Sequence, residues 1–149
     1  MSLKYWALSD QEGFTLVEFL VALLIFAVGI LGLTSLQVLV LRNDISAHQY
    51  AQAVQISYSM MDRLRSNRNS AMAGNYNLAN AAAVPIGDGI APLADDDLAD
   101  WVANELNLLP NANVVINCTQ TGNCTVTVSW SDRGDPNVPV QTHTLNANI

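Results

Sequence analysis

The sequence predicts an α+β protein in which one long N-terminal helix, transmembrane in its first half, packs on a small head with an antiparallel β-sheet. Three observations support this fold class. Residues 19–41 contain no charged side chain, residues 42–68 continue without a proline, and residues 113–149 alternate apolar and polar side chains in short runs. At 149 residues, the chain has room for one modest domain in addition to a membrane segment.

The long helix is expected to run from Phe14 to about Arg68. Its charge-free run is 23 residues long, and a helix needs roughly 20 residues to cross a hydrocarbon core of about 30 Å. One acid, Glu18, stands directly before this run. An ionised carboxylate at the centre of a span costs on the order of 2.5–3.5 kcal/mol and less near the interface, so Glu18 calls for a partner. A cut after Gly13 would expose an amine one helical turn away.

The residues Gly13-Phe14-Thr15-Leu16-Val17-Glu18, followed by the apolar helix, resemble the processing signal of type IV pilin-like proteins. That family includes pilins, minor pilins and type II secretion pseudopilins. The stretch from Phe19 to Leu33 is similar to PilV-type minor pilins in particular. The resemblance implies that a prepilin peptidase cuts between Gly13 and Phe14 and methylates the new amine of Phe14. It also implies that Glu18 helps to register subunits in the growing filament.

The resemblance further implies a lollipop fold with four segments. These are a leader peptide (1–13), a transmembrane and later filament-core helix (14–41), the periplasmic half of the same helix (42–69) and a globular head (70–149). The implied function is that of a minor pilin, not an enzyme, which joins other minor pilins in a complex that primes type IV pilus assembly at the pilus tip. Its partners would be the prepilin peptidase, other minor pilins, the major pilin, the pilus assembly platform and the inner membrane.

The implied location is the bacterial inner membrane with the head in the periplasm, and then the assembled pilus. Two other functions fit the same residues: a minor pseudopilin of a type II secretion system, and a membrane-anchored periplasmic binding module in which Glu18 is incidental. Pairing of Glu18 with the amine of its own helix is a further alternative to pairing between subunits. The leader departs from the family pattern because Asp10 and Glu12 occupy a region that is usually basic. Orientation therefore rests on the resemblance more than on charge.

The net charge of −7 argues against general nucleic-acid binding, which needs clustered Lys or Arg to contact phosphates. Three basic residues do cluster, Arg63, Arg65 and Arg68, and we expect them to interact with the C-terminal dipole of the long helix. His48 is expected on the helix surface. Apolar residues at spacings of three or four predict the face that packs on the head: Ala47, Tyr50, Val54, Tyr58, Met61 and Leu64.

Residues 70–92 are rich in Asn, Ala and Gly and predict an irregular connection, with Gly74 as the stop of the long helix. A second helix is expected from Asp95 to Pro110, where acidic residues suit the positive N-terminal end. The acids Asp95, Asp96 and Asp97 are an alternative calcium site, but they lack the alternating spacing of a calcium loop. The predicted buried face of this helix consists of Leu98, Trp101, Val102, Leu106 and Leu109.

Two strands are predicted around residues 114–118 and 124–130, each with one apolar face. Pairing Cys118 with Cys124 places Ile116 against Val126 and aligns the two apolar faces. A turn at residues 132–137 and a third strand from Val138 to Leu145 complete the sheet, with Pro139 best suited to an edge.

Beyond a membrane span, Cys118 and Cys124 predict one structural disulfide in an oxidising compartment. A redox pair or half of a zinc site are alternatives, but the spacing is not C-x-x-C and the chain has no further cysteine. No catalytic constellation and no phosphate-binding loop stands out. We therefore expect no catalytic residue, no metal and no cofactor.

Overall fold

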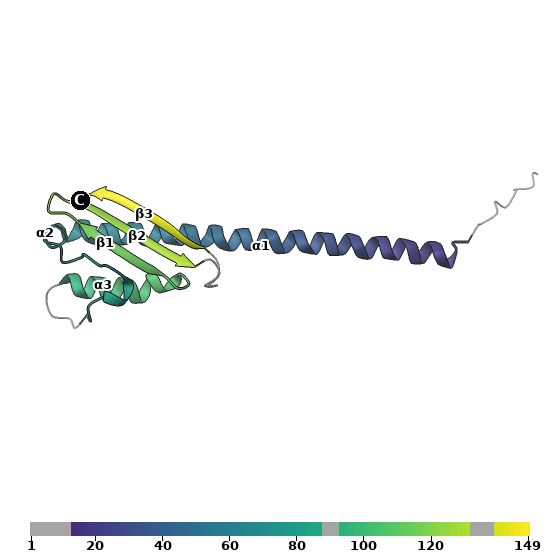
Figure 1. Cartoon of the computed structure of the whole chain (residues 1–149), viewed down its shortest axis with the longest axis horizontal. Helices are drawn as coiled ribbons and strands as arrows, with labels where there is room; N and C mark the ends of the chain where they lie inside the picture. The colour runs from purple at the N-terminus through teal and green to yellow at the C-terminus, as the bar shows by residue number, and fades with distance from the viewer. Residues whose placement is uncertain (1–12, 88–92, 132–138) are drawn as a thin grey trace, which may run out of the picture. The chain divides into compact units, whose positions relative to one another are not determined.

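The computed structural model describes residues 13–87, 93–131 and 139–149. The chain divides into two compact units, one up to Leu41 and one from Arg42 to Ile149, which we term the apolar unit and the head unit. Helix α1 (Leu16–Ser66) passes from one unit into the other (Figure 1). The predicted long helix is thus confirmed, with ends two residues inside those expected.

In the apolar unit, α1 continues without interruption through Gly29 and Gly32. The hydroxyl of Thr34 donates to the carbonyl of Ile30 at 2.9 Å, and that of Ser35 donates to the carbonyl of Leu31 at 3.0 Å. These bonds satisfy the two hydroxyls within the helix, where a lipid environment offers no partner. Among the described residues, α1 is the helix long and apolar enough to cross a membrane.

In the head unit, α1 buries only part of the predicted face. Met61 and Leu64 are buried as predicted. The other predicted positions are exposed or only partly buried: Ala47, Tyr50, Val54 and Tyr58. The buried face also includes Ser57, whose hydroxyl donates to the carbonyl of Ala53 at 2.8 Å and so needs no outside partner. The buried residues are Ala53, Ile56, Ser57, Met60, Met61 and Leu64.

The connection after α1 is more ordered than its composition predicts. A short helix α2 (Arg68–Met72) follows, and Gly74, with φ of +86°, adopts the left-handed conformation that suits a helix stop. The prediction that Gly74 stops the long helix was wrong, because α1 ends at Ser66 and Gly74 follows α2. Leu78 then pairs with Ile116 through two backbone hydrogen bonds of 2.9 and 2.8 Å. A 3-10 turn η1 (Ala81–Ala83) comes next. The prediction of an irregular segment is therefore confirmed for most of residues 73–87, with the bridge at Leu78 and η1 as the exceptions. Residues 88–92 lie outside the described residues.

Helix α3 (Leu93–Asn104) begins two residues before the predicted start and is followed by a 3-10 turn η2 (Leu106–Leu108). Its predicted buried face is confirmed except at Val102, which is only partly buried. The indole N–H of Trp101 donates to the carbonyl of Ile56 at 3.2 Å. This bond joins α3 to α1 and satisfies the polar atom of a fully buried aromatic side chain.

The sheet contains strands β1 (Asn113–Cys118), β2 (Asn123–Ser131) and β3 (Val140–Asn148) in the order β1-β2-β3, all antiparallel. The predicted register of β1 and β2 is confirmed, and a disulfide joins Cys118 to Cys124. The third strand lies at a sheet edge, as Pro139 suggested. It ends at Asn148, three residues later than predicted, and the predicted turn at 132–137 lies outside the described residues.

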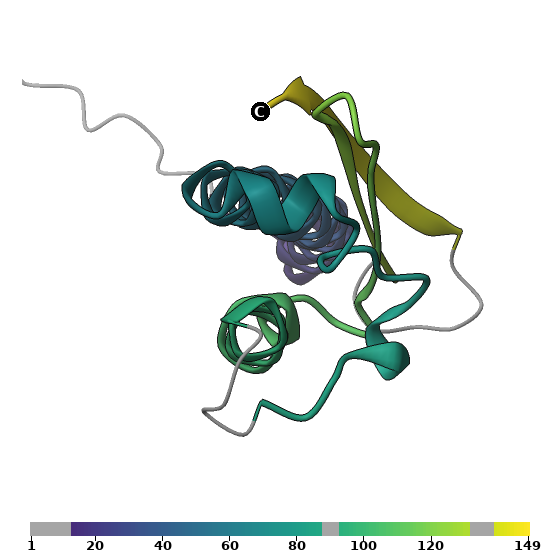
Figure 2. The same cartoon turned by 90° about the vertical axis from the view of Figure 1, so that its left-hand side faces the viewer.

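Helices α1 and α3 lie side by side against one face of the sheet in the head unit, as the end-on view shows (Figure 2). The inward side chains of β1 and β2 meet those of both helices in one hydrophobic core. The opposite face of the sheet carries Thr, Ser and Asn, many of them exposed. This alternation is typical of an antiparallel sheet with one solvated face.

Candidate functional site

The bond between Gly13 and Phe14 lies in accessible chain ahead of α1. Residues 13–15 have no regular secondary structure, and the Phe14 side chain is 86% exposed. No other atom lies within 4 Å of where a Cβ on Gly13 would stand. A peptidase could therefore bind this bond in extended form without unwinding the helix.

Thr15 caps the N-terminus of α1. Its side-chain Oγ1 accepts the backbone N–H of Glu18 at 3.3 Å, and its carbonyl accepts the N–H of Phe19 at 3.2 Å. This is the arrangement of an N-cap residue, which satisfies an N–H group left over at a helix start. The sequence analysis did not single out Thr15, although Thr followed three residues later by Glu is the capping-box pattern and could have revealed it.

Glu18 lies in the first turn of α1 and is exposed. A negative charge at this place interacts favourably with the positive end of the helix dipole. Among the described residues, no basic side chain forms an ion pair with it. In the uncut chain the nitrogen of Phe14 is an amide, so the amine that could neutralise Glu18 exists only after cleavage.

The apolar surface that follows is entirely unburied within the chain. The large apolar side chains from Phe14 to Leu41 are between 43% and 86% exposed. Monomeric soluble proteins rarely expose a continuous apolar surface of this size. Such a surface is typical of a helix that lies in lipid or among other apolar helices.

Residues 8–34 match the prokaryotic N-terminal methylation motif. The motif indicates a type IV pilin-like protein. The match covers the cleavage signal and the first part of the apolar run, and it ends well before the head unit. No curated protein and no solved structure matches the chain.

The motif implies processing by a prepilin peptidase and contact with the pilus assembly machinery. Together with the apolar helix, it fits membrane anchoring followed by incorporation into a pilus. Pilin-like proteins are structural proteins and are generally not enzymes.

In the head unit, Arg63 binds acids of α3 and the residue that follows that helix. Its guanidinium lies 2.8 Å from Asp100, 3.0 Å from Glu105 and 3.7 Å from Asp97. Partial burial lowers the pKa of Arg63, but the hydrogen bonds to Asp100 and Glu105 outweigh this effect and leave the pKa raised. The bonds from Arg63 and Asn104 hold the pKa of Asp100 below its usual value.

The predicted placement of the basic cluster at the end of α1 is confirmed for Arg63 and Arg65, which lie in its last turn. Arg63 also donates to the backbone carbonyl of Asp97 at 3.4 Å, and Arg65 pairs with Asp62 at 3.0 Å on the helix surface. For Arg68 the prediction was wrong, because Arg68 begins α2 and donates to the carbonyl of Ile149 at 2.6 Å. Arg63 therefore ties α1 to α3, and Arg68 ties α2 to the residue after β3, which charge counting alone could not show.

Tyr76 connects the loop after α2 to the same acids. Its hydroxyl donates to Asp97 and accepts from the side-chain amide of Asn67 at 3.2 Å. Burial and the bond to Asp97 raise the pKa of Tyr76 to about 12. Asp97, one of the three acids considered for calcium, is therefore bound to Tyr76 and Arg63. Within the described part of the chain, no three His, Cys, Asp or Glu residues gather in a way that could hold a metal.

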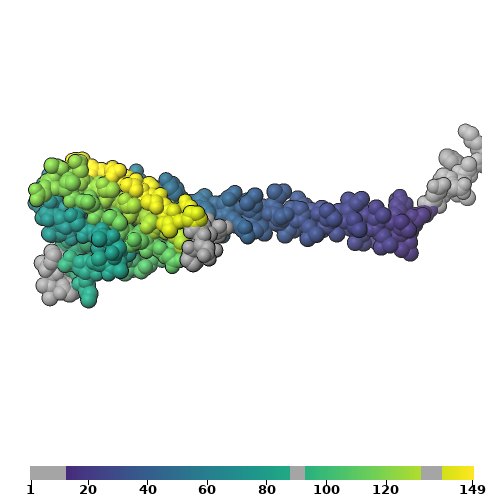
Figure 3. Space-filling model, viewed as in Figure 1, coloured from purple at the N-terminus to yellow at the C-terminus, as the bar shows by residue number. Residues whose placement is uncertain are grey.

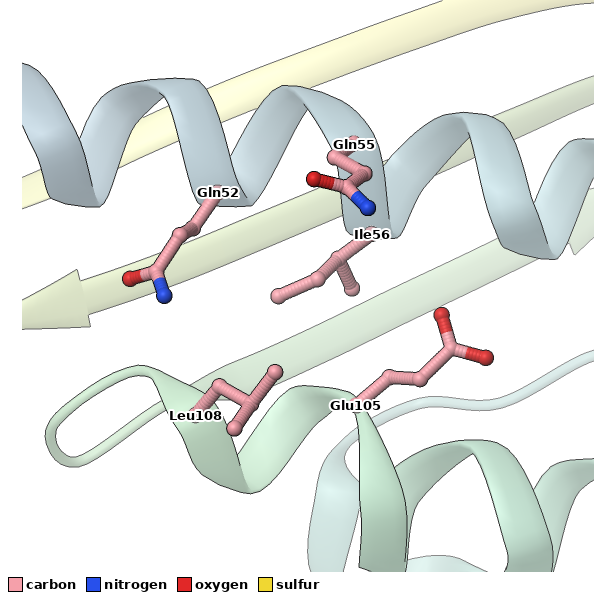
Figure 4. A pocket seen from close by; sticks show the side chains of 5 residues that line it. All are labelled: Gln52, Gln55, Ile56, Glu105 and Leu108. Atoms are coloured by element: carbon pink, nitrogen blue, oxygen red, sulfur yellow. The ribbon is translucent and has the colours of Figure 1, made fainter.

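A hollow of about 200 Å³ lies between α1 and the end of α3 (Figure 4). Gln52, Gln55 and Ile56 approach it from α1, and Glu105 and Leu108 approach it from the opposite side. The carboxylate of Glu105 already binds Arg63. The lining offers no nucleophile next to a base, so the hollow is best explained as a packing seam between the two helices.

Proposed function

We propose that this protein is a minor pilin of the PilV type, which joins other minor pilins in a complex that primes type IV pilus assembly at the pilus tip. The observation that supports the proposal most is the N-terminal arrangement. An accessible Gly13–Phe14 bond, a capped helix start and a lone acid in the first turn precede a fully exposed apolar helix. The resemblance of residues 19–33 to PilV-type minor pilins supports the finer assignment.

In this proposal the prepilin peptidase removes residues 1–13 and methylates the amine of Phe14. Residues 14–41 hold the protein in the inner membrane, with residues 42–149 in the periplasm. During assembly the apolar helix leaves lipid and packs among the helices of neighbouring subunits. Lipid and helix surfaces are similarly apolar, so burial alone gives this step little direction. Pairing of Glu18 with the Phe14 amine of an adjacent subunit favours the assembled state and sets the register between the two helices.

The mass of the mature N-terminus tests the processing step. We expect the protein purified from its own membranes to begin at a methylated Phe14. In a Gly13→Val variant, the branched side chain should block the peptidase and leave the leader attached, while the head folds as before. A protein that still begins at Met1 in the presence of an active peptidase would contradict the proposal and favour an anchored binding module.

The role of Glu18 is tested by Glu18→Gln, which keeps the size of the side chain and removes its charge. We expect normal cleavage and normal membrane content, but strong loss of the protein from sheared pili. Glu18→Asp, which keeps the charge, is the matched control and should retain part of the incorporation. Equal incorporation of wild type and Glu18→Gln would show that the acid is incidental.

Deletion of the protein separates the pilus from the secretion machine. A minor pilin that primes assembly should, when deleted, reduce the number of surface pili and leave type II secretion intact. Loss of secretion with normal pili would instead identify a minor pseudopilin.

A further inference from the structure

Among the described residues, strand β3 has a neighbouring strand on one side only. It pairs with β2 through nine consecutive residues, from Val140 opposite Ser131 to Asn148 opposite Asn123. It forms a continuous margin of the head unit at the surface (yellow in Figure 3). In the described part of the chain, the side of β3 that faces away from β2 is therefore an unpaired sheet edge.

The register shows which backbone groups of β3 point to that edge. Both backbone groups of Ile116 bond to Leu78, so Ile116 and Val126 form a pair without mutual hydrogen bonds. The backbone groups of Val126 must then bond to Leu145 on its other side. The backbone groups of the odd-numbered residues of β3 therefore all point toward β2. The even-numbered residues direct N–H and C=O groups outward, and all of them are exposed: Val140, Thr142, Thr144, Asn146 and Asn148.

The edge of β3 lacks the features that normally protect an edge strand. It contains no charged residue, no internal proline and no bulge. The opposite edge of the sheet is covered, because Leu78 pairs with Ile116 and the side chain of Asn77 accepts the N–H of Cys118 at 2.7 Å. The same sheet thus closes one edge and leaves the other open.

Beside the open edge, α1 carries a partly exposed apolar row. Tyr50 is 51% exposed and lies against His143 of β3, with ring centroids 5.6 Å apart. Val54 and Tyr58 follow at intervals of four, so they lie on the same flank of the helix. Tyr58 is 52% exposed. We call Tyr50, Val54 and Tyr58 the flank row.

The flank row lies on the side of α1 away from α3, whose contacts with α1 run through Ile56 and Arg63. Strand β3 runs in the same direction as α1 (Figure 1). His143, near the start of β3, lies against Tyr50, and the chain end at Ile149 binds Arg68 beyond the end of α1. A strand added to β3 would therefore lie above this flank. Its inward side chains, on every second residue, would cover the row.

We propose that β3 accepts an extended segment of another protein as a fourth strand. The unpaired backbone groups of β3 can bond to an extended segment. The flank row beneath them favours apolar side chains at alternate positions of that segment. Because β3 carries no charge, the paired positions of that segment are uncharged. This mode gives affinity through backbone hydrogen bonds and selectivity through the alternate side chains.

A second copy of this chain does not fit the edge. Two β3 strands paired parallel would invert the second sheet and place the mostly polar, even-numbered side chains of its β3 over the apolar flank row. Two β3 strands paired antiparallel would hold the two α1 helices in opposite directions, whereas both must enter one membrane at their Arg42 ends. This step rests on the membrane anchoring in the proposed function. A β1 strand from a second copy is not available either, because its outer edge is already bonded to Leu78 and Asn77. The occupant is therefore a different protein.

Hydrogen exchange of the full-length chain in detergent micelles tests the open edge. The probe is a peptide of alternating threonine and valine with a lysine at each end. We expect it to slow exchange of the Thr142, Thr144 and Asn146 amides about ten-fold or more, since their N–H groups become bonded. The amides of His143 and Leu145, already bonded to β2, should change little. A peptide with a central proline is the control and should protect none of them.

Absence of this alternating protection would overturn the proposal. So would protection that appears without peptide and increases with protein concentration, because a second copy would then be the occupant. Thr144→Pro removes an outward N–H and should abolish the effect, while Thr144→Ser should keep it. The experiment needs neither leader cleavage nor filament assembly, so its failure is distinguishable from failure of the proposed function.

Crosslinking in cells tests the identity of the occupant. A photo-reactive residue placed at position 144 should form an adduct with one uncharged extended segment of a different protein. The same residue at position 127, on the polar face of the central strand, is the control and should not form it. A homodimer adduct from position 144, or equal adducts from both positions, would contradict the proposal.

Discussion

The guanidinium of Arg63 donates to the carboxylate of Asp100 at 2.8 Å, and these two residues lie 37 positions apart in the chain. The same guanidinium lies 3.0 Å from Glu105, so one side chain of α1 pairs with an acid of α3 and with the residue that follows that helix. Removal of Arg63 would leave several carboxylates close together without their counter-charge. The stability of the α1–α3 contact should therefore depend on this single arginine.

Arg63→Met, which keeps much of the apolar stem, should lower the free energy of unfolding of the head by about 1–2 kcal/mol, since the pairs are only partly buried. Urea unfolding followed by tryptophan fluorescence would report it through Trp101. Arg65→Met is the matched control, because its pair with Asp62 lies on the helix surface and should be worth less than about 0.5 kcal/mol. Equal losses in the two variants would count against a special role for Arg63.

The raised pKa of Tyr76 predicts that the head loses stability at alkaline pH. Its pKa is raised to about 12 in the fold, against about 10 when unfolded. The fold therefore favours the neutral phenol, and this contribution is complete below about pH 10 and lost as the pH rises towards about 12. Tyr76→Phe should be less stable than wild type near neutral pH because it lacks two hydrogen bonds.

Melting temperatures of both proteins between about pH 8 and about pH 11.5 measure this effect. The difference between wild type and Tyr76→Phe should shrink steadily above about pH 10, since only the wild type loses this contribution. The other tyrosines ionise in both proteins and cancel in the comparison. A constant difference across the whole range would show that Tyr76 is not stabilised in its neutral form.

The disulfide should stabilise the sheet without determining its register. Replacing both Cys118 and Cys124 by alanine should cost about 2 kcal/mol, because the loop that they close is short. The register should survive, since Leu78 and Asn77 hold the outer side of β1 independently. Amide exchange of Val115 and Thr127, a pair whose backbone groups bond to each other across β1 and β2, would show whether it does. Loss of protection at both amides would mean that the disulfide is required for the pairing itself.

Thr15 should hold the first turn of α1 together after processing. Thr15→Ala removes the acceptor of the Glu18 N–H and should cost about 1 kcal/mol locally. We expect the Glu18 amide to exchange several-fold faster in micelles, while amides one turn further along are unaffected. Thr15→Ser keeps the hydroxyl and should exchange as the wild type does. Identical exchange in all three proteins would show that the Thr15 hydroxyl does not cap the helix.

Several features of this protein follow from the sequence because they depend on residues close together in the chain. The apolar run determines the membrane-competent half of α1, and the pattern from Gly13 to Glu18 lies within the segment that matches the N-terminal methylation motif. The pairing of Cys118 with Cys124 belongs to a hairpin, in which alternation and a short loop leave one register that keeps both apolar faces on the same side.

Other features were decided only by the tertiary structure. The sequence favoured Tyr58 over Ser57 for the core, because apolarity is visible in a sequence and close approach is not. The Ser57 hydroxyl can be buried because it bonds to the carbonyl of Ala53 in its own helix, so no buried polar group is left unsatisfied. The partners of Arg63, the pairing of Leu78 with Ile116 and the open edge of β3 likewise depend on residues that are distant in the chain. Local periodicity carries no information about which distant surfaces meet, and packing alone selects them.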